Sequence, residues 1–178
     1  MGAAAALYRG EIRVADTDRE RYLQLPVGTA RHPSETPERL VLRLFALGLL
    51  GDPQSGFRAG VSAGDEPDLA TRDGDGRITR WIDVGTPGLE RLRGATRRGR
   101  GIAVLTHNGL LERWRRQHGG NLALAADWEV WSVDADLVDT LARGLQPRFS
   151  WDLTLSGGML YVTADGTSLC SEFVRIVA

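Results

Sequence analysis

Hydrophobic and polar residues alternate at the start of the chain. Ile12 and Val14 are flanked by charged residues, which gives the two-residue period of a half-buried strand. The segment RYLQLPVGTA, residues 21–30, predicts a second strand that returns beside the first. After residue 143 the pattern predicts antiparallel strands with a turn at SGG, residues 156–158. We therefore expect a strand pair at the N-terminus and antiparallel strands at the C-terminus.

The segment HPSETPERLVLRLFALGLLGDP, residues 32–53, predicts a helix with defined ends. Ser34 or Thr36 is a candidate N-cap, Pro37 suits the first turn, and Gly51 suits the end. Steps of four, three and four residues place on one helix face Glu38, Leu42, Phe45 and Leu49. The carboxylate of Glu38 thus lies at the N-terminal end of an apolar stripe. It either faces a functional site or only interacts favourably with the positive end of the helix dipole.

Three strand-like segments and a second helix follow this helix. The strand-like segments are GFRAGVSAG (56–64), DEPDLATR (65–72) and GRITRWIDVG (76–85). The next expected elements are a helix at 87–99, a strand at 101–107, a helix at 109–118, a strand at 121–133 and a helix at 134–143. The alternation of strands and helices predicts an α/β (α+β) fold, and the length suits one domain over residues 1–178.

Two aspartates fall at the ends of neighbouring predicted strands. Asp83 lies at the end of one strand, and Asp68 follows Pro67 at the start or edge of another. The hairpin between them would bring the two carboxylates together, although the sequence does not fix the register. With the carbonyl of Val84, and with Glu38 directly or through water, they would form an oxygen-rich site suited to Mg²⁺ or Mn²⁺.

The opposing interpretation is that these acids are ordinary residues of turns and strand edges. It is the better account of Asp73 and Asp75, because Asp-Gly pairs are common turn residues. The three histidines have no metal-ligand spacing, and no glycine-rich phosphate loop occurs. The tryptophans fall mostly on strand-like positions, where core packing is the expected role.

The charge of the chain is unevenly distributed. The net charge is −1, all 22 basic side chains are arginine, and residues 91–116 carry eight arginines and one acid, a net charge of +7 (8 − 1). We expect Arg97, Arg98 and Arg100 in this segment to contact a nucleic-acid backbone. The alternative is a solvated helix face.

The composition narrows the class of protein without naming a function. With 42% hydrophobic and 25% charged residues, the chain is typical of soluble globular proteins and unlike disordered or fibrous ones. The single cysteine, Cys170, predicts a small buried side chain in a reducing compartment. The longest apolar stretch, residues 44–50, is too short for a membrane span, so we expect a cytoplasmic protein.

Four separated motifs resemble the bacterial YaeQ family in order and spacing. They are ARHPSETPERLVLRLFA (30–46), DEPDL (65–69), WIDVGTP (81–87) and RLRGA (91–95). The resemblance covers most of the chain from about Tyr8 and implies a variant of the PD-(D/E)XK restriction-endonuclease-like fold, with an αβββαβ core. The metal-site acids of that fold correspond here to Glu38, Asp68 and Asp83.

Two glycines depart from the pattern that this resemblance implies. Gly85 stands where the wider superfamily has lysine, and Gly94 stands where relatives commonly have lysine on the next helix. Arg91 and Arg98 share the helical stripe of Gly94. Arginine stabilises an anion, but it is always charged and therefore cannot act as a general base.

Two functions are compatible with these features. The first is a Mg²⁺- or Mn²⁺-dependent phosphodiesterase acting on nucleic acid, in which Arg91, Arg93 or Arg98 holds the phosphate and metal-activated water attacks. The second is a catalytically inactive nuclease-fold module that binds nucleic acid or a protein partner. The missing lysine favours the second function, and the three carboxylates favour the first.

Overall fold

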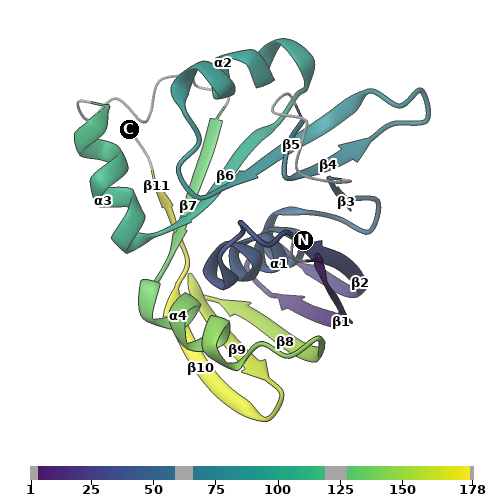
Figure 1. Ribbon diagram of the computed structural model, residues 1–178, viewed down its shortest axis with the longest axis vertical. Helices are drawn as coiled ribbons and strands as arrows, with labels where there is room; N and C mark the ends of the chain where they lie inside the picture. Colours follow the sequence, from purple (N-terminus) through teal and green to yellow (C-terminus); the bar gives the residue numbers. More distant parts are fainter. Residues whose placement is uncertain (1–3, 59–65, 119–127, 177–178) are drawn as a thin grey trace.

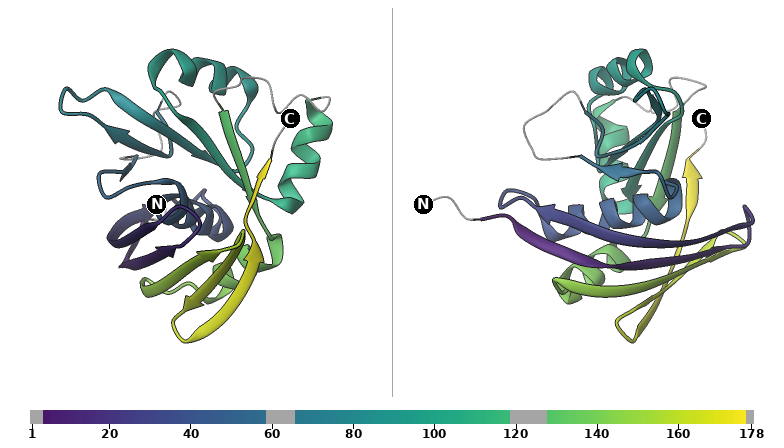
Figure 2. Two further views of the ribbon diagram at one scale, coloured as in Figure 1. Left: turned by 180° about the vertical axis from the view of Figure 1, so that it is seen from behind. Right: turned by 90° about the vertical axis from the view of Figure 1, so that its right-hand side faces the viewer.

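The computed structural model describes residues 4–58, 66–118 and 128–176, and its backbone forms two mixed sheets and four helices (Figure 1). The five-stranded sheet has the order β10-β9-β8-β1-β2, and the six-stranded sheet has the order β11-β7-β6-β5-β4-β3. Helix α1 (Pro37–Leu50) lies between the two sheets (Figure 2). The molecule is therefore layered as sheet, helix and sheet.

The five-stranded sheet joins the two ends of the chain. Its strands are β1 (Ala6–Asp16), β2 (Arg21–Arg31), β8 (Arg148–Ser156), β9 (Met159–Ala164) and β10 (Thr167–Glu172). The predicted N-terminal pair and C-terminal antiparallel strands are confirmed. Strand β8 pairs in parallel with β1, with Ile12 opposite Trp151. The alternation in sequence identified these strands but gave no sign that they share one sheet.

The six-stranded sheet carries the segments expected to hold the site. Its strands are β3 (Gly56–Phe57), β4 (Leu69–Arg72), β5 (Ile78–Val84), β6 (Ile102–His107), β7 (Trp128–Val133) and β11 (Val174–Ile176). Strands β5, β6 and β7 are parallel, and β4 is antiparallel to β5. The expected strand residues 59–65 and 121–127 lie outside the described residues.

The four helices are α1 (Pro37–Leu50), α2 (Leu89–Arg98), α3 (Asn108–Gln117) and α4 (Ala135–Gly144). From α1 to β6 the elements follow the expected order of helix, three strands, helix and strand. Thr36, and not Ser34, is the N-cap of α1, because its hydroxyl accepts the N–H of Arg39.

Helix α1 is buried on all sides along most of its length. Every residue from Leu40 to Leu50 is buried, whereas the sequence predicted burial of only one face of this helix. The sheets meet at its C-terminal end, where Arg21 of β2 donates to the carbonyl of Leu49 (3.0 Å) and Arg80 of β5 donates to that of Leu50 (2.9 Å). These guanidinium groups satisfy carbonyls that the helix itself leaves without partners.

Two composition-based predictions have different outcomes. Trp81, Trp114 and Trp151 are fully buried, which confirms the core role of most tryptophans. The prediction for Cys170 is wrong, because this thiol is exposed on the outer face of β10, opposite Tyr161 of β9. Among the described residues, no helix is both long and apolar enough to cross a membrane.

Candidate functional site

The three predicted acids line one hollow at the edge of the six-stranded sheet. The hollow has a volume of about 540 Å³ and lies among the start of α1, the end of β5, and the starts of α2 and α3. We call it the site hollow; its charged and titratable lining residues are Glu38, Arg39, Arg58, Asp68, Asp83, Arg91 and His107. The structure thus brings together residues that are up to 69 positions apart (107 − 38) in the chain.

The register of the β4–β5 hairpin places the two aspartates side by side. Leu69 pairs with Ile82, so the residues that flank this pair, Asp68 and Asp83, are neighbours. The N–H of Asp68 donates to Oδ1 of Asp83 at 3.1 Å. Both residues are buried, with 4% and 1% of their surface exposed. A buried carboxylate needs hydrogen-bond donors or a counter-charge, and each aspartate has both.

Asp83 is bound by four N–H groups. Arg91 donates Nε to Oδ2 (2.8 Å) and Nη2 to Oδ1 (2.9 Å), while the indole of Trp81 donates to Oδ2 (3.0 Å). The fourth donor is the N–H of Asp68. A carboxylate offers about four lone-pair positions, so Asp83 is saturated. The guanidinium of Arg91 also lies over the Trp81 ring, 5.7 Å from its centroid.

Asp68 is held by a second arginine and by the backbone. Arg39 donates Nη2 to Oδ1 at 2.6 Å, and the N–H of Val84 donates to Oδ2 at 2.9 Å. Burial lowers the pKa of the Arg39 guanidinium, but the nearby carboxylates of Asp68 and Glu35 outweigh it and raise this pKa overall. Arg39 therefore carries its charge at all ordinary pH values.

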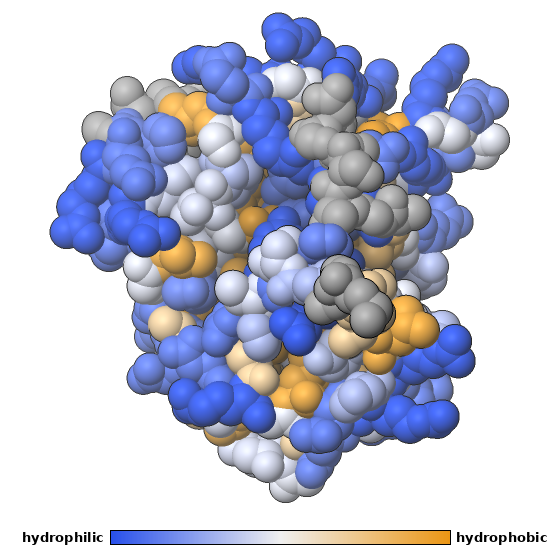
Figure 3. Space-filling model, viewed as in Figure 1, coloured by the Kyte–Doolittle hydropathy of each residue, from blue (hydrophilic) through white to orange (hydrophobic). Residues whose placement is uncertain are grey.

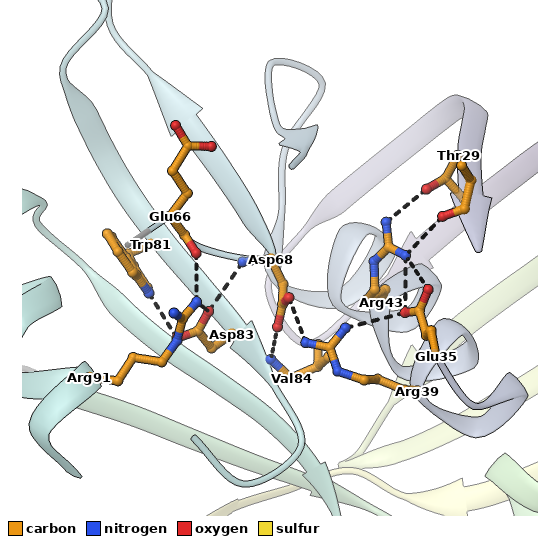
Figure 4. Close-up of polar contacts among 11 residues, drawn as sticks. Thr29, Glu35, Arg39, Arg43, Glu66, Asp68, Trp81, Asp83, Val84 and Arg91 are labelled. Atoms are coloured by element: carbon orange, nitrogen blue, oxygen red, sulfur yellow. Dashed lines mark hydrogen bonds and ion pairs between the residues drawn. The ribbon is translucent and has the colours of Figure 1, made fainter. Parts of the chain in front are cut away.

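The pairs continue into one network of arginines and carboxylates (Figure 4). Arg39 also donates to Glu35 (3.2 Å), and Glu35 accepts from Arg43 (2.9 Å). Arg43 reaches the five-stranded sheet through the hydroxyl of Thr29 (2.8 Å). We call the ion network the set Arg91, Asp83, Asp68, Arg39, Glu35 and Arg43. Its three arginines and three carboxylates connect one sheet to the other through α1.

Glu35, Arg39 and Arg43 were not predicted as site residues. Their spacing of four residues is a signal in the sequence, because it places them on one side of a helical turn. Only the pairing of Arg39 with Asp68, 29 positions away, turns this local row into part of the site.

The donor set does not fit a Mg²⁺ or Mn²⁺ ion in this arrangement. Among the described residues, no three His, Cys, Asp or Glu side chains lie close enough to hold one ion. Asp83 is saturated by N–H donors, and Val84 contributes its N–H to Asp68. An ion would require Arg91 or Arg39 to leave a buried carboxylate, which would give up charge-assisted hydrogen bonds. The metal site at Glu38, Asp68, Asp83 and Val84 stays a prediction.

His107 is a residue of the site hollow that the sequence did not single out. It ends β6 and caps α3, with Nδ1 accepting the N–H of Leu110 (3.4 Å). Burial lowers the pKa of His107 below its usual 6.5, against the opposing effect of Asp139 and Glu38. His107 is therefore a neutral group beside an otherwise charged wall at neutral pH.

The remaining predicted site residues lie apart from this contact network. Arg93 pairs with Glu90 (2.6 Å) on the exposed side of α2, outside the lining of the site hollow.

Gly85, where a lysine was expected, has φ of +83°, so a lysine at this position would adopt the unfavourable left-handed conformation. At Gly94, an added Cβ atom would meet nothing within 4 Å. The two glycines that stand in place of lysine thus differ, because only the backbone of Gly94 accepts a side chain without strain.

A second hollow, of about 640 Å³, lies between the β4–β5 turn and the C-terminal end of α2. We call it the arginine hollow; its arginines are Arg72, Arg77, Arg97, Arg98 and Arg100. A bridge between Ile78 and Gly99 holds the two segments together. A smaller hollow shares Arg97 and Arg98 with the arginine hollow and Arg91 with the site hollow. The surface over α2 and this hairpin is mostly hydrophilic (Figure 3).

Comparison with known proteins identifies relatives over nearly the whole chain. YaeQ from Salmonella typhi, described as an uncharacterized protein, is 32% identical over 164 residues, 92% of this chain and 91% of its own. The protein of the same name from Escherichia coli K12 is 29% identical over 170 residues, 95% of this chain and 94% of its own.

Two solved structures of YaeQ proteins have the same fold as this chain. The crystal structure of the YaeQ protein from Xanthomonas axonopodis pv. citri matches with a TM-score of 0.90 and 32% identity, over 98% of this chain and 99% of that one. The YaeQ protein from Pseudomonas syringae matches with a TM-score of 0.87 and 30% identity, over 98% and 97%. The family model of the YaeQ protein matches residues 1–173, and the chain therefore belongs to the YaeQ family.

Proposed function

We propose that this protein is a nuclease-fold module that binds a nucleic-acid backbone through the arginine hollow. The observation that carries the proposal is the gathering of five arginines, from two separate segments, around one hollow with a single acid, Asp73. The element order from α1 to β6 supports placing the fold with PD-(D/E)XK nuclease-like proteins. In this proposal the buried carboxylates of Asp68 and Asp83 have a structural role, and they do not bind a metal ion.

The chemistry of the arginine hollow suits phosphodiesters. A guanidinium group donates two parallel N–H bonds to a phosphate, and it keeps its charge at any physiological pH. The hollow carries a formal charge of +4, from five arginines and Asp73, although the chain as a whole carries −1. Binding a polyanion there would release condensed counterions, which drives association.

Metal-dependent cleavage of a phosphodiester is the second candidate function. The observation in its favour is that Glu38, Asp68 and Asp83 line one hollow. Against it, Arg91 and Arg39 already bind the two aspartates, and Gly85 has no lysine-like group. Incubation of labelled DNA and RNA with the protein, in EDTA and then in Mg²⁺ or Mn²⁺, should give no cleavage. Metal-dependent cleavage that disappears in Asp83→Asn would establish the second candidate instead.

Salt-dependent binding tests the proposal. We would measure affinity for duplex DNA across a salt series for the wild type and for Arg72→Gln/Arg97→Gln/Arg100→Gln. Each lost phosphate contact should reduce the log–log slope by about 0.9, so the triple variant should lose up to about 2.7. The matched control is Arg113→Gln/Arg115→Gln/Arg116→Gln on α3, which removes the same charge elsewhere. Equal weakening by the control, or no binding of either duplex or single-stranded DNA at low salt, would reject the proposal.

A further inference from the structure

A third hollow adjoins the site hollow on the other side of Arg39. It has a volume of about 500 Å³ and lies among β2, the loop before α1, α1 itself and β3. It shares with the site hollow Arg39, Arg58 and Asp68. One ligand can therefore contact both hollows across these residues. We call it the β2 hollow.

We infer that the β2 hollow is a subsite for one unpaired nucleoside of the bound nucleic acid. The inference rests on the proposed function and specifies its ligand as single-stranded. Phe57, Ala5 and Ala30 supply the apolar part of the lining, and Thr29 and Ser34 supply hydroxyl groups. The charged side chains of the lining are Glu35, Arg39, Arg43, Arg58 and Asp68. The volume of the β2 hollow falls within the range of small-molecule sites, about 300–1,000 Å³.

Part of the wall of the β2 hollow is held by contacts of the ion network. The buried guanidinium of Arg43 lies over the Phe57 ring, 5.0 Å from its centroid, and binds both Glu35 and Thr29. Unstacked bases are recognised by stacking on aromatic rings or guanidinium planes and by hydrogen bonds to their edges. In the β2 hollow, Phe57 offers an aromatic ring, and Thr29 and Ser34 offer hydroxyl groups.

The shared rim suits the phosphate of the same nucleotide. The side chain of Arg39 is 39% exposed, and its contacts to Asp68 and Glu35 leave other N–H groups of the guanidinium available. A phosphate on this rim would place its base in the β2 hollow and leave the neighbouring backbone facing the site hollow. Because a paired base cannot enter such a hollow, a single strand should bind better than a duplex.

Mononucleotides test the subsite without depending on the arginine hollow. We would titrate the four nucleoside monophosphates, ribose 5-phosphate and inorganic phosphate into the full-length protein by calorimetry. A stacked base should make at least one nucleoside monophosphate bind about tenfold more tightly than ribose 5-phosphate. Phe57→Leu should remove most of that difference, whereas Tyr161→Leu, at an exposed aromatic of β9, should retain it.

The outcomes separate this inference from the proposed function. Equal binding of ribose 5-phosphate and all four monophosphates would overturn the subsite, even if the polymer binds with the expected salt dependence. If the protein binds nucleoside monophosphates with a base preference but does not bind DNA or RNA, the subsite would be supported and the proposed function rejected. If Phe57→Leu does not fold, an oligonucleotide with abasic positions replaces it, and its equal affinity to the intact oligonucleotide would overturn the subsite.

Discussion

The ion network and the arginine hollow use the same side chain in opposite ways. In the network the arginines face buried carboxylates, and the side chains of Arg43 and Glu35 are only 8% and 7% exposed. In the arginine hollow the arginines are exposed, and within the described residues the side chains of Arg97 and Arg100 form no hydrogen bond or ion pair. Burial therefore separates Arg43, which holds the fold together, from the exposed arginines that are available to a ligand.

The energetic consequences of the two arrangements differ accordingly. A buried ion pair adds little net stability, but removing one partner leaves an uncompensated charge and costs about 3–5 kcal/mol. An exposed pair contributes about 0–1 kcal/mol. Removing a charged side chain from the ion network should therefore destabilise the protein. Removing one from the arginine hollow should instead weaken ligand binding.

The largest expected effect comes from Glu35→Ala. This change leaves the buried guanidinium of Arg43 without its carboxylate, so the free energy of unfolding should fall by about 3 kcal/mol or more. Urea unfolding would measure it. The matched control is Glu112→Ala on α3, where the carboxylate is 69% exposed and should contribute less than about 0.5 kcal/mol. Similar losses in both variants would remove the distinction between the two regions.

A much smaller stability effect is expected in the arginine hollow. The variant Arg72→Gln/Arg97→Gln/Arg100→Gln removes exposed charges of one sign, so its unfolding free energy should stay within about 0.5 kcal/mol per position of the wild type. The same variant should bind duplex DNA with a reduced salt slope. A large loss of stability would mean that these arginines also hold the fold together.

The smallest effect concerns His107, whose pKa is lowered in the folded protein. Above its unfolded value of 6.5 the residue is neutral in both states. As the pH falls below 6.5, the unfolded chain takes up the proton more readily, so stability declines until the lowered pKa is reached. His107→Asn keeps an N-cap and should weaken the loss of stability between about pH 7.5 and 5.5. An unchanged loss in this variant would assign it to other groups.

The sequence predicted the elements well because their signals are local. Alternation identified β1 and β2, and the capping residues defined α1. The contacts of the site depend instead on how distant segments meet. Nothing local indicates that Arg91 saturates Asp83 or that Arg39 reaches Asp68, since both pairings require the β4–β5 register and the position of α1.

The same limit explains two residues that sequence reasoning assigned incorrectly or missed. Cys170 was expected inside, but alternation along β10 turns it outward and places Ser171 inward. Arg72 was not expected near α2, because it belongs to an ordinary turn hairpin; only the bridge between Ile78 and Gly99 brings it there. Residues of this kind require the arrangement of the sheets.

The stability of Asp83→Asn in EDTA tests the central claim most directly. If Arg91 and Trp81 hold Asp83 as part of the ion network, the amide group of asparagine would face N–H donors, and unfolding free energy should fall by about 3 kcal/mol. Asp75→Asn, at a side chain that is 76% exposed, is the control and should be neutral. Clustered carboxylates awaiting an ion repel each other, so the opposite account predicts that Asp83→Asn is at least as stable as the wild type in EDTA. That result, together with stabilisation of the wild type alone by Mg²⁺ or Mn²⁺, would contradict the ion network and restore the metal site.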